Sequence, residues 1–125
     1  MKKLYKINGQ NFSTLEGFYE EFSKKVLTAN WGHNLDAFDD VLIGGFGTPD
    51  EGFILVWKNS NISQEQLGYP ETVRQLKLRL ERCHPSNRDY VKKDLERAEK
   101  NEGPTVFDWL IEIIEDHKDI ELKVE

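Results

Sequence analysis

A run of five consecutive apolar residues, at positions 53–57, constrains the fold of this chain more than any other feature. A strand that is apolar at every position is typical of one covered on both faces, as at the centre of a parallel sheet. Residues 3–7 also read as a short strand, and the alternation of Ile120, Leu122 and Val124 with charged residues predicts another at the end of the chain. The sequence therefore predicts three strands, with residues 53–57 in the middle.

Helical patterns separate these strands. Ser13 and Glu16 have the spacing of a capping box, and Asn34 and Gly44 are suited to begin and end a second helix. Apolar residues at helical spacing predict helices over residues 13–27, 34–44, 70–83 and 87–100, with a last one beginning at 103–105. Because helical crossovers join parallel strands, we predict one α/β domain over residues 1–125, a small three-stranded parallel sheet packed with helices.

The composition excludes several classes of protein. The chain has 125 residues and a net charge of −6, which disfavours direct binding of nucleic acid because such binders usually carry a basic surplus. No apolar run approaches the roughly 20 residues that cross a bilayer, and no signal peptide is visible. The single cysteine, Cys83, excludes an internal disulfide and a cysteine metal cage. We expect a cytosolic protein that needs no cofactor, contacts no membrane and is monomeric when free.

Charge is distributed unevenly along the chain. Residues 26–57 contain five acidic residues and no Lys or Arg, residues 72–100 contain nine basic and five acidic residues, and residues 101–125 contain two basic and eight acidic residues. Two acidic zones therefore bracket a basic one, and an acidic zone attracts cationic partners.

The sequence carries no catalytic signature. His33, His84 and His117 are not at metal-ligand spacing, and the adjacent Cys83 and His84 would project about 100° apart on a helix. The glycines within residues 44–52 match neither a phosphate-binding loop nor a dinucleotide fingerprint. We therefore predict that the protein is not an enzyme.

The predicted helix over residues 34–44 carries Asp36, Asp39 and Asp40 toward one side. The helix dipole favours Asp36 but opposes Asp39 and Asp40 by about 0.3–1 kcal/mol each, so the free protein gains little from this arrangement. A cationic partner would explain it. The plainer interpretation is an ordinary polar helix face, and a third is a divalent metal such as Mg²⁺ held by the three carboxylates.

Two aromatic residues flank this helix in predicted loops, Trp31 before it and Phe46 after it. Aromatic residues around a charged patch are typical anchors of protein interfaces. The alternative for Trp31 is that it folds back into the core.

The segment from Asn30 to Gly44 resembles the barstar family, bacterial intracellular inhibitors of barnase-type ribonucleases. The family pattern is an aromatic residue, Gly, any residue, Asn-Leu-Asp-Ala, two residues, Asp and later Gly. This chain supplies Trp31, Gly32, residues 34–37, Asp40 and Gly44. The resemblance covers residues 1–66 and 104–125.

The resemblance implies a barstar-like fold, no catalysis, and a basic, barnase-like ribonuclease as partner. The acidic helix and the loop before it would plug the nuclease active site, with the carboxylates of Asp36 and Asp40 in the place of RNA phosphates. In the barnase–barstar pair, close charge pairs are strongly coupled and steer association. From the charge argument and the resemblance together we predict a ribonuclease inhibitor or immunity protein with partner contacts at Asn30, Trp31, Asn34, Leu35, Asp36, Asp39, Asp40, Gly44, Phe46 and Glu112.

The chain also departs from the family pattern. Asn30 and Asp39 stand where the family has aromatic residues, and Ile43 replaces a hydroxyl residue, so the target nuclease need not be barnase. Residues 69–102 have no counterpart and read as an extra helical insertion with a basic face. That insertion is the alternative working surface, which would make the protein a barstar-like interaction or regulatory module.

Overall fold

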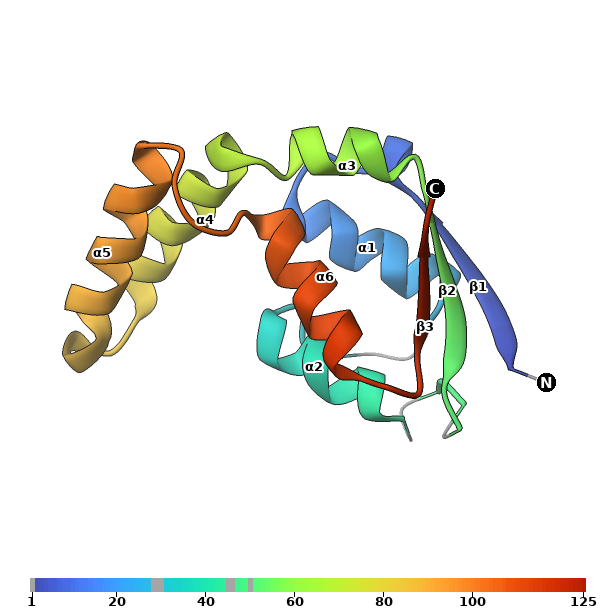
Figure 1. The fold of residues 1–125 in the computed structure, drawn as a ribbon. Coiled ribbons are helices and arrows are strands. Elements are labelled where there is room, and N and C mark those ends of the chain that lie inside the picture. Colours follow the sequence, from blue (N-terminus) through green and yellow to red (C-terminus); the bar gives the residue numbers. More distant parts are fainter. Residues whose placement is uncertain (1, 28–30, 45–46, 50) are drawn as a thin grey trace.

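The computed structural model describes residues 2–27, 31–44, 47–49 and 51–125 of the chain (Figure 1). Its elements follow one another in the order β1 (Lys3–Asn8), the short 3-10 helix η1 (Gly9–Asn11), α1 (Leu15–Lys25), α2 (Leu35–Ile43), β2 (Phe53–Lys58), α3 (Ser60–Gln66), α4 (Tyr69–Arg82), the 3-10 helix η2 (Pro85–Asn87), α5 (Arg88–Glu99), α6 (Val106–Asp116) and β3 (Glu121–Val124).

The three strands form a parallel sheet with β2 between β1 and β3, which confirms the predicted α/β class and the central position of β2. Leu55 of β2 lies opposite Tyr5 on one side and opposite Leu122 on the other. Helical crossovers connect the strands, since α1 and α2 lie between β1 and β2, and the remaining helices lie between β2 and β3.

The hydrophobic core lies on one face of this sheet, where α1, α2 and α6 gather (Figure 1). Phe53, Leu55 and Trp57 are fully buried on that face. Ile54 and Val56 alternate with them and so lie on the opposite face, outside the core cluster. The main core therefore lies on one face of the strand, whereas the sequence predicted that both faces are covered.

Val56 is nevertheless buried, although it lies outside the core cluster of the described residues. The register places Lys6 of β1 on one side of Val56 and Lys123 of β3 on the other. The methylene stems of lysines can cover an apolar neighbour while their ammonium groups stay in water. A central strand can thus be apolar at every position without a second layer of helices.

Helix α3 was not predicted, because it lacks an apolar stripe. The residue that it buries is Ser63, whose Oγ accepts a hydrogen bond of 2.9 Å from the indole nitrogen of Trp57. The helix begins after Asn59, which adopts a left-handed conformation with φ 55°. It is therefore held in place by a buried polar contact, which hydrophobic periodicity does not reveal.

Helix α1 is capped one residue later than predicted. The N-cap is Thr14, whose hydroxyl accepts the backbone N–H of Gly17 at 3.0 Å, and not Ser13. With Thr14 as the N-cap, Glu16 is the second helical residue and not the third, so it does not complete a capping box. Its carboxylate binds Arg74 and Gln75 of α4 instead. The predicted local contact has been replaced by a contact with a distant helix.

Helices α4 and α5 form a hairpin, here termed the arm, that extends away from the sheet (Figure 1). Leu76, Val91 and Ala98 form a small core of their own between these helices. Trp109 of α6 packs against both this small core and the main one. The two helices lie within residues 69–102, where the sequence predicts additional helices.

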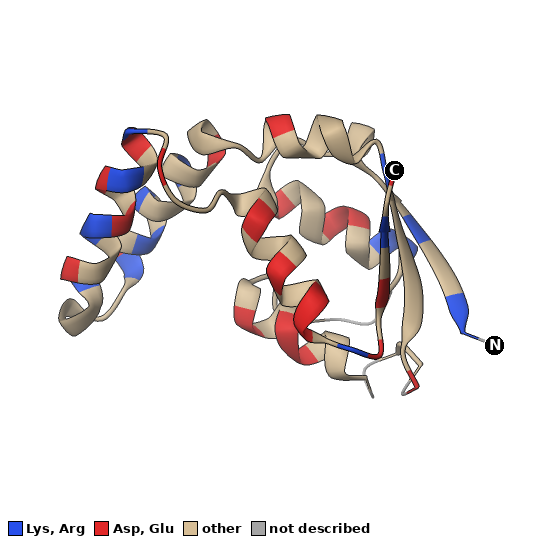
Figure 2. Ribbon diagram, viewed as in Figure 1, with Lys and Arg blue, Asp and Glu red and all other residues tan. Residues whose placement is uncertain are grey.

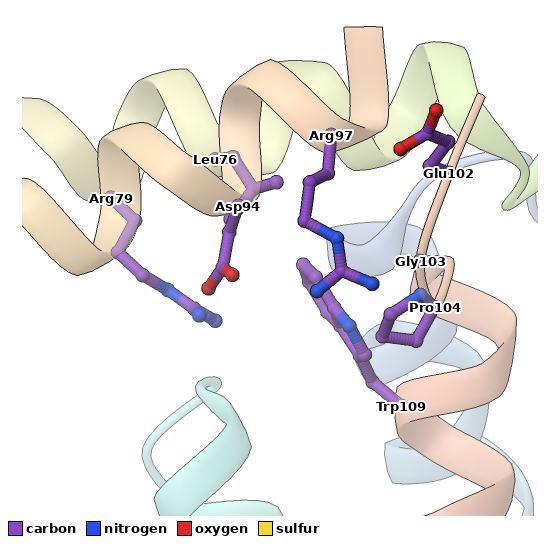
Figure 3. Close-up of a pocket in the computed structure, with 8 residues that line it drawn as sticks. All are labelled: Leu76, Arg79, Asp94, Arg97, Glu102, Gly103, Pro104 and Trp109. Carbon is purple, nitrogen blue, oxygen red and sulfur yellow. The ribbon is translucent and has the colours of Figure 1, made fainter. Parts of the chain in front are cut away.

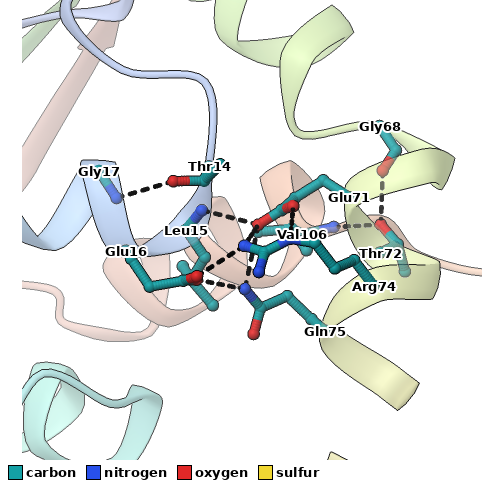
Figure 4. A network of polar contacts seen from close by, with 10 residues as sticks. All are labelled: Thr14, Leu15, Glu16, Gly17, Gly68, Glu71, Thr72, Arg74, Gln75 and Val106. Carbon is teal, nitrogen blue, oxygen red and sulfur yellow. Dashed lines mark hydrogen bonds and ion pairs between the residues drawn. The ribbon is translucent and has the colours of Figure 1, made fainter. Parts of the chain in front are cut away.

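A polar network fastens the base of the arm to α1 (Figure 4). Glu71 of α4 is only 6% exposed, and its Oε2 accepts the backbone N–H of Leu15 at 2.9 Å. Arg74 bridges the carboxylates of Glu71 and Glu16 at 2.7 and 2.6 Å. Hydrogen bonds to these two carboxylates raise the pKa of Arg74 above its ordinary value. Partial burial disfavours the ionised form of Glu16, but hydrogen bonds from Arg74 and Gln75 outweigh it and lower the pKa of this carboxyl.

Glu71→Gln is expected to lower the free energy of unfolding by about 2 kcal/mol, because a buried carboxylate that accepts several hydrogen bonds is lost and Arg74 keeps only Glu16. Urea denaturation followed by circular dichroism measures the change. Glu81→Gln is the matched control, since Glu81 is exposed on the same helix. Equal stability of the two variants would contradict the structural role of Glu71.

Candidate partner-binding site

Helix α2 presents an acidic face to solvent. Asp36, Asp39 and Asp40 are all exposed, while Phe38, Val41 and Leu42 are buried against the core. Ile43 follows the acidic residues at helical spacing and is 67% exposed. Ile43, which departs from the family pattern, lies on the same face as Asp36 and Asp40 because of its helical spacing from them.

The ends of α2 form as predicted. Asn34 is the N-cap, and its side-chain oxygen accepts the backbone N–H of Ala37 at 2.8 Å. Gly44 ends the helix with φ 111°, a conformation that favours glycine. Leu35 is half-buried and packs against the main core. Asn30 and Phe46, also predicted as contacts, lie outside the described residues.

The carboxylates of α2 differ in their surroundings. Among the residues that the structure describes, no Lys or Arg forms an ion pair with Asp36 or Asp40. Asp39 does have a partner, because its Oδ1 lies 2.6 Å from Nε2 of His117 at the end of α6. This contact joins residues 78 positions apart, so no pattern in the sequence could indicate it.

Helix α6 lies beside α2 and extends the acidic surface (Figures 1 and 2). Glu112, predicted as a contact, is exposed on α6, as are Glu115 and Asp116. Neither helix contains a Lys or Arg, and neither has a basic residue in its last turn to offset the helix dipole. The two helices together therefore present a surface of one charge sign.

Trp31 packs back onto α1. Its indole nitrogen donates a hydrogen bond of 2.7 Å to the hydroxyl of Ser23, and its ring meets Tyr19 edge-on with centroids 5.6 Å apart. The side chain is half-buried, and the centroid of its ring also lies 4.7 Å from the ring centroid of His33. Trp31 thus packs partly against the core, as one interpretation predicted, and the rest of its side chain is open to solvent. Its role as a partner contact stays a prediction.

A groove of about 680 Å³ lies between the start of α2 and the arm. Glu16 and Tyr19 of α1, Leu35 and Asp36 of α2, and Arg79 and Arg82 of α4 are among the residues that line it. Burial, with a smaller contribution from the charge of Glu16, raises the pKa of the Tyr19 hydroxyl. The groove could not be predicted from the sequence, because its walls come from segments far apart in the chain.

The described residues contain no group of three or more His, Cys, Asp or Glu arranged to hold a metal ion. None of the helices in this part of the chain is both long enough and apolar enough to span a membrane.

The comparison with protein families gives one match, over residues 2–90, to the model described as Barstar (barnase inhibitor). The match covers most of the chain, and the protein therefore belongs to the barstar family. It runs through α4 into α5, beyond residue 66 where we expected the resemblance to pause, and it does not reach α6 and β3. The comparison with curated proteins gave no match.

Proposed function

We propose that this protein is an inhibitor, or immunity protein, that binds a basic barnase-type ribonuclease and blocks its active site with α2. The exposed carboxylates of Asp36 and Asp40, which lack Lys or Arg partners among the described residues, carry this proposal. In the complex they take the place of RNA phosphates and pair with the cationic side chains that grip phosphate. Membership of the barstar family supports the same class of partner.

The acidic helices act at two stages of binding. Over distances longer than a contact, the charge of α2 and α6 attracts a basic protein and raises the association rate. At contact, a helix already held in one conformation loses little conformational freedom. The cap at Asn34 and the Asp39–His117 contact hold α2 in this way. Inhibition then needs no catalytic step by the inhibitor itself.

Helix α2 is favoured over the arm as the principal binding surface. The arm mixes basic and acidic residues along both of its helices, whereas α2 and α6 carry charge of one sign (Figure 2). A cationic active site is attracted by the acidic surface of α2 and α6, and much less by the mixed charges of the arm.

The proposal is tested by titrating the protein against a panel of basic barnase-type ribonucleases in an RNA-cleavage assay. At least one nuclease is expected to lose its activity at a stoichiometric ratio. The association rate constant for that pair is expected to fall at least about ten-fold between low salt and about 1 M salt, where the Debye length shrinks to about 3 Å. Full activity of every nuclease in excess protein, or association that is independent of salt, would reject the proposal.

A further inference from the structure

The groove between α2 and the arm has walls of opposite charge. Asp36 of α2 lies on one side of it, and Arg79 and Arg82 of α4 lie on the other. Leu35 contributes an apolar surface between them. Glu16 also lines the groove, but its carboxylate already binds Arg74 of α4. Within the described part of the chain, no ion pair of 4 Å or less joins Asp36 to Arg79 or Arg82. The opposite charges therefore face a common space without closing it.

The basic wall is held at a fixed position. Two hydrogen bonds tie the base of the arm to α6 and to the loop before it. The Tyr69 hydroxyl donates to the carbonyl of Gly103 in that loop at 2.8 Å, and the backbone N–H of Val106 in α6 donates to the Thr72 hydroxyl at 2.9 Å. Together with the Glu71 network at α1, these contacts fix where α4 begins (Figure 4). The start of the basic wall is thus held in place by the fold.

Arg79 is positioned further along the same wall. Its guanidinium lies over the ring of Trp109, 5.1 Å from the centroid, in a cation–π contact. Asp94 of α5 lines the same small pocket as these two side chains (Figure 3). Arg82 lies one helical turn further along α4 and does not line that pocket. Arg79 is therefore held by a contact within the protein, whereas Arg82 is the better placed of the two to bind a group on a partner.

We infer that the arm forms the second wall of the partner-binding site, and that Arg82, assisted by Arg79, binds a carboxylate on a loop of the ribonuclease. The inference rests on the proposed function, since the opposite wall of the groove contains Asp36. Charge complementarity selects the occupant: a loop that places a cation against Asp36 and an acidic side chain against α4 satisfies both walls. Arginine suits this task because its planar guanidinium binds carboxylates through two parallel hydrogen bonds.

The arm would then determine which ribonucleases are bound. The carboxylates of α2 satisfy any active site that grips phosphate, so they discriminate little among nucleases of this class. A nuclease whose loop carries a basic residue at the arm would be repelled, and such mismatched charges are a common source of specificity.

The inference is tested with Arg82→Glu and its matched control Lys92→Glu, which change the net charge equally on the same arm. Lys92 is exposed on α5 and does not line the groove. Binding of the inhibited ribonuclease is measured by surface plasmon resonance. Arg82→Glu is expected to weaken affinity at least about ten-fold, mainly through faster dissociation, whereas Lys92→Glu changes it less than about two-fold. Arg82→Gln and Lys92→Gln provide a second pair without a reversed charge at the end of α4.

Two outcomes separate this inference from the proposed function. If the Arg82 variants bind like the Lys92 controls, or more tightly, while Asp40→Ala weakens binding, the arm does not contact a carboxylate and only the inference fails. If neither the Arg82 variants nor Asp40→Ala changes affinity, both the inference about the arm and the proposed function fail.

Discussion

Asp40→Ala is expected to weaken binding of the inhibited ribonuclease by about 2–5 kcal/mol, or from about 30-fold to several thousand-fold in the dissociation constant. The carboxylate of Asp40 is exposed in the free protein. In the proposed complex it would be buried against a cationic side chain, and its removal would leave that cation desolvated and unpaired. Most of the loss is therefore expected in the dissociation rate, measured by surface plasmon resonance.

Two further variants make this result specific to Asp40. Glu65→Ala removes the same charge from an exposed position on α3, away from the acidic helices, and is expected to leave the dissociation rate unchanged. Asp39→Ala is expected to have a smaller effect than Asp40→Ala, because Asp39 already contacts His117 within the free protein. Similar losses of affinity in Asp40→Ala and Glu65→Ala would mean that only net charge affects binding and that α2 makes no direct contact with the ribonuclease.

The overall architecture could be predicted because the signals for it are local. The apolar residues of β2 required a central position, and the alternation at the end of the chain marked β3. Asn34 and Gly44 gave the correct ends of α2 because a cap acts on backbone groups within one turn. The exposure of Asp36 and Asp40 followed in the same way, from the period of the helix that carries them.

Features that depend on distant residues could not be predicted. The capping box at Ser13 did not form, because the helix begins after Thr14 and the Glu16 carboxylate binds Arg74, 58 positions away. The Asp39–His117 contact and the groove between α2 and the arm likewise depend on how α4 and α6 pack. Sequence spacing thus identified which side chains of α2 face solvent. It did not identify which residues of other helices lie next to them.

The conformation at Gly52 leads to the second large effect, which concerns stability. Gly52 precedes β2 and has φ 91°, a region that residues with a Cβ rarely adopt. An added Cβ would lie 1.9 Å from the carbonyl oxygen of Asp119, which is backbone and cannot rotate away. Asp119 lies in the turn between α6 and β3, two residues after His117. A displaced turn would therefore disturb both the pairing of β3 and the contact between His117 and Asp39.

Gly52→Ala is accordingly expected to lower the free energy of unfolding by about 2–5 kcal/mol, combining about 1–2 kcal/mol for the left-handed backbone with about 1–3 kcal/mol for the forced displacement. Gly32→Ala is the matched control: Gly32 is exposed, and an added Cβ would lie 3.4 Å from Asn34 Nδ2, an ordinary contact. The free energy of unfolding of Gly32→Ala is expected to lie within about 0.5 kcal/mol of that of the unsubstituted protein. Urea denaturation of both variants makes the comparison. Equal stability would show that β2 and the turn before β3 do not approach as closely as this fold requires.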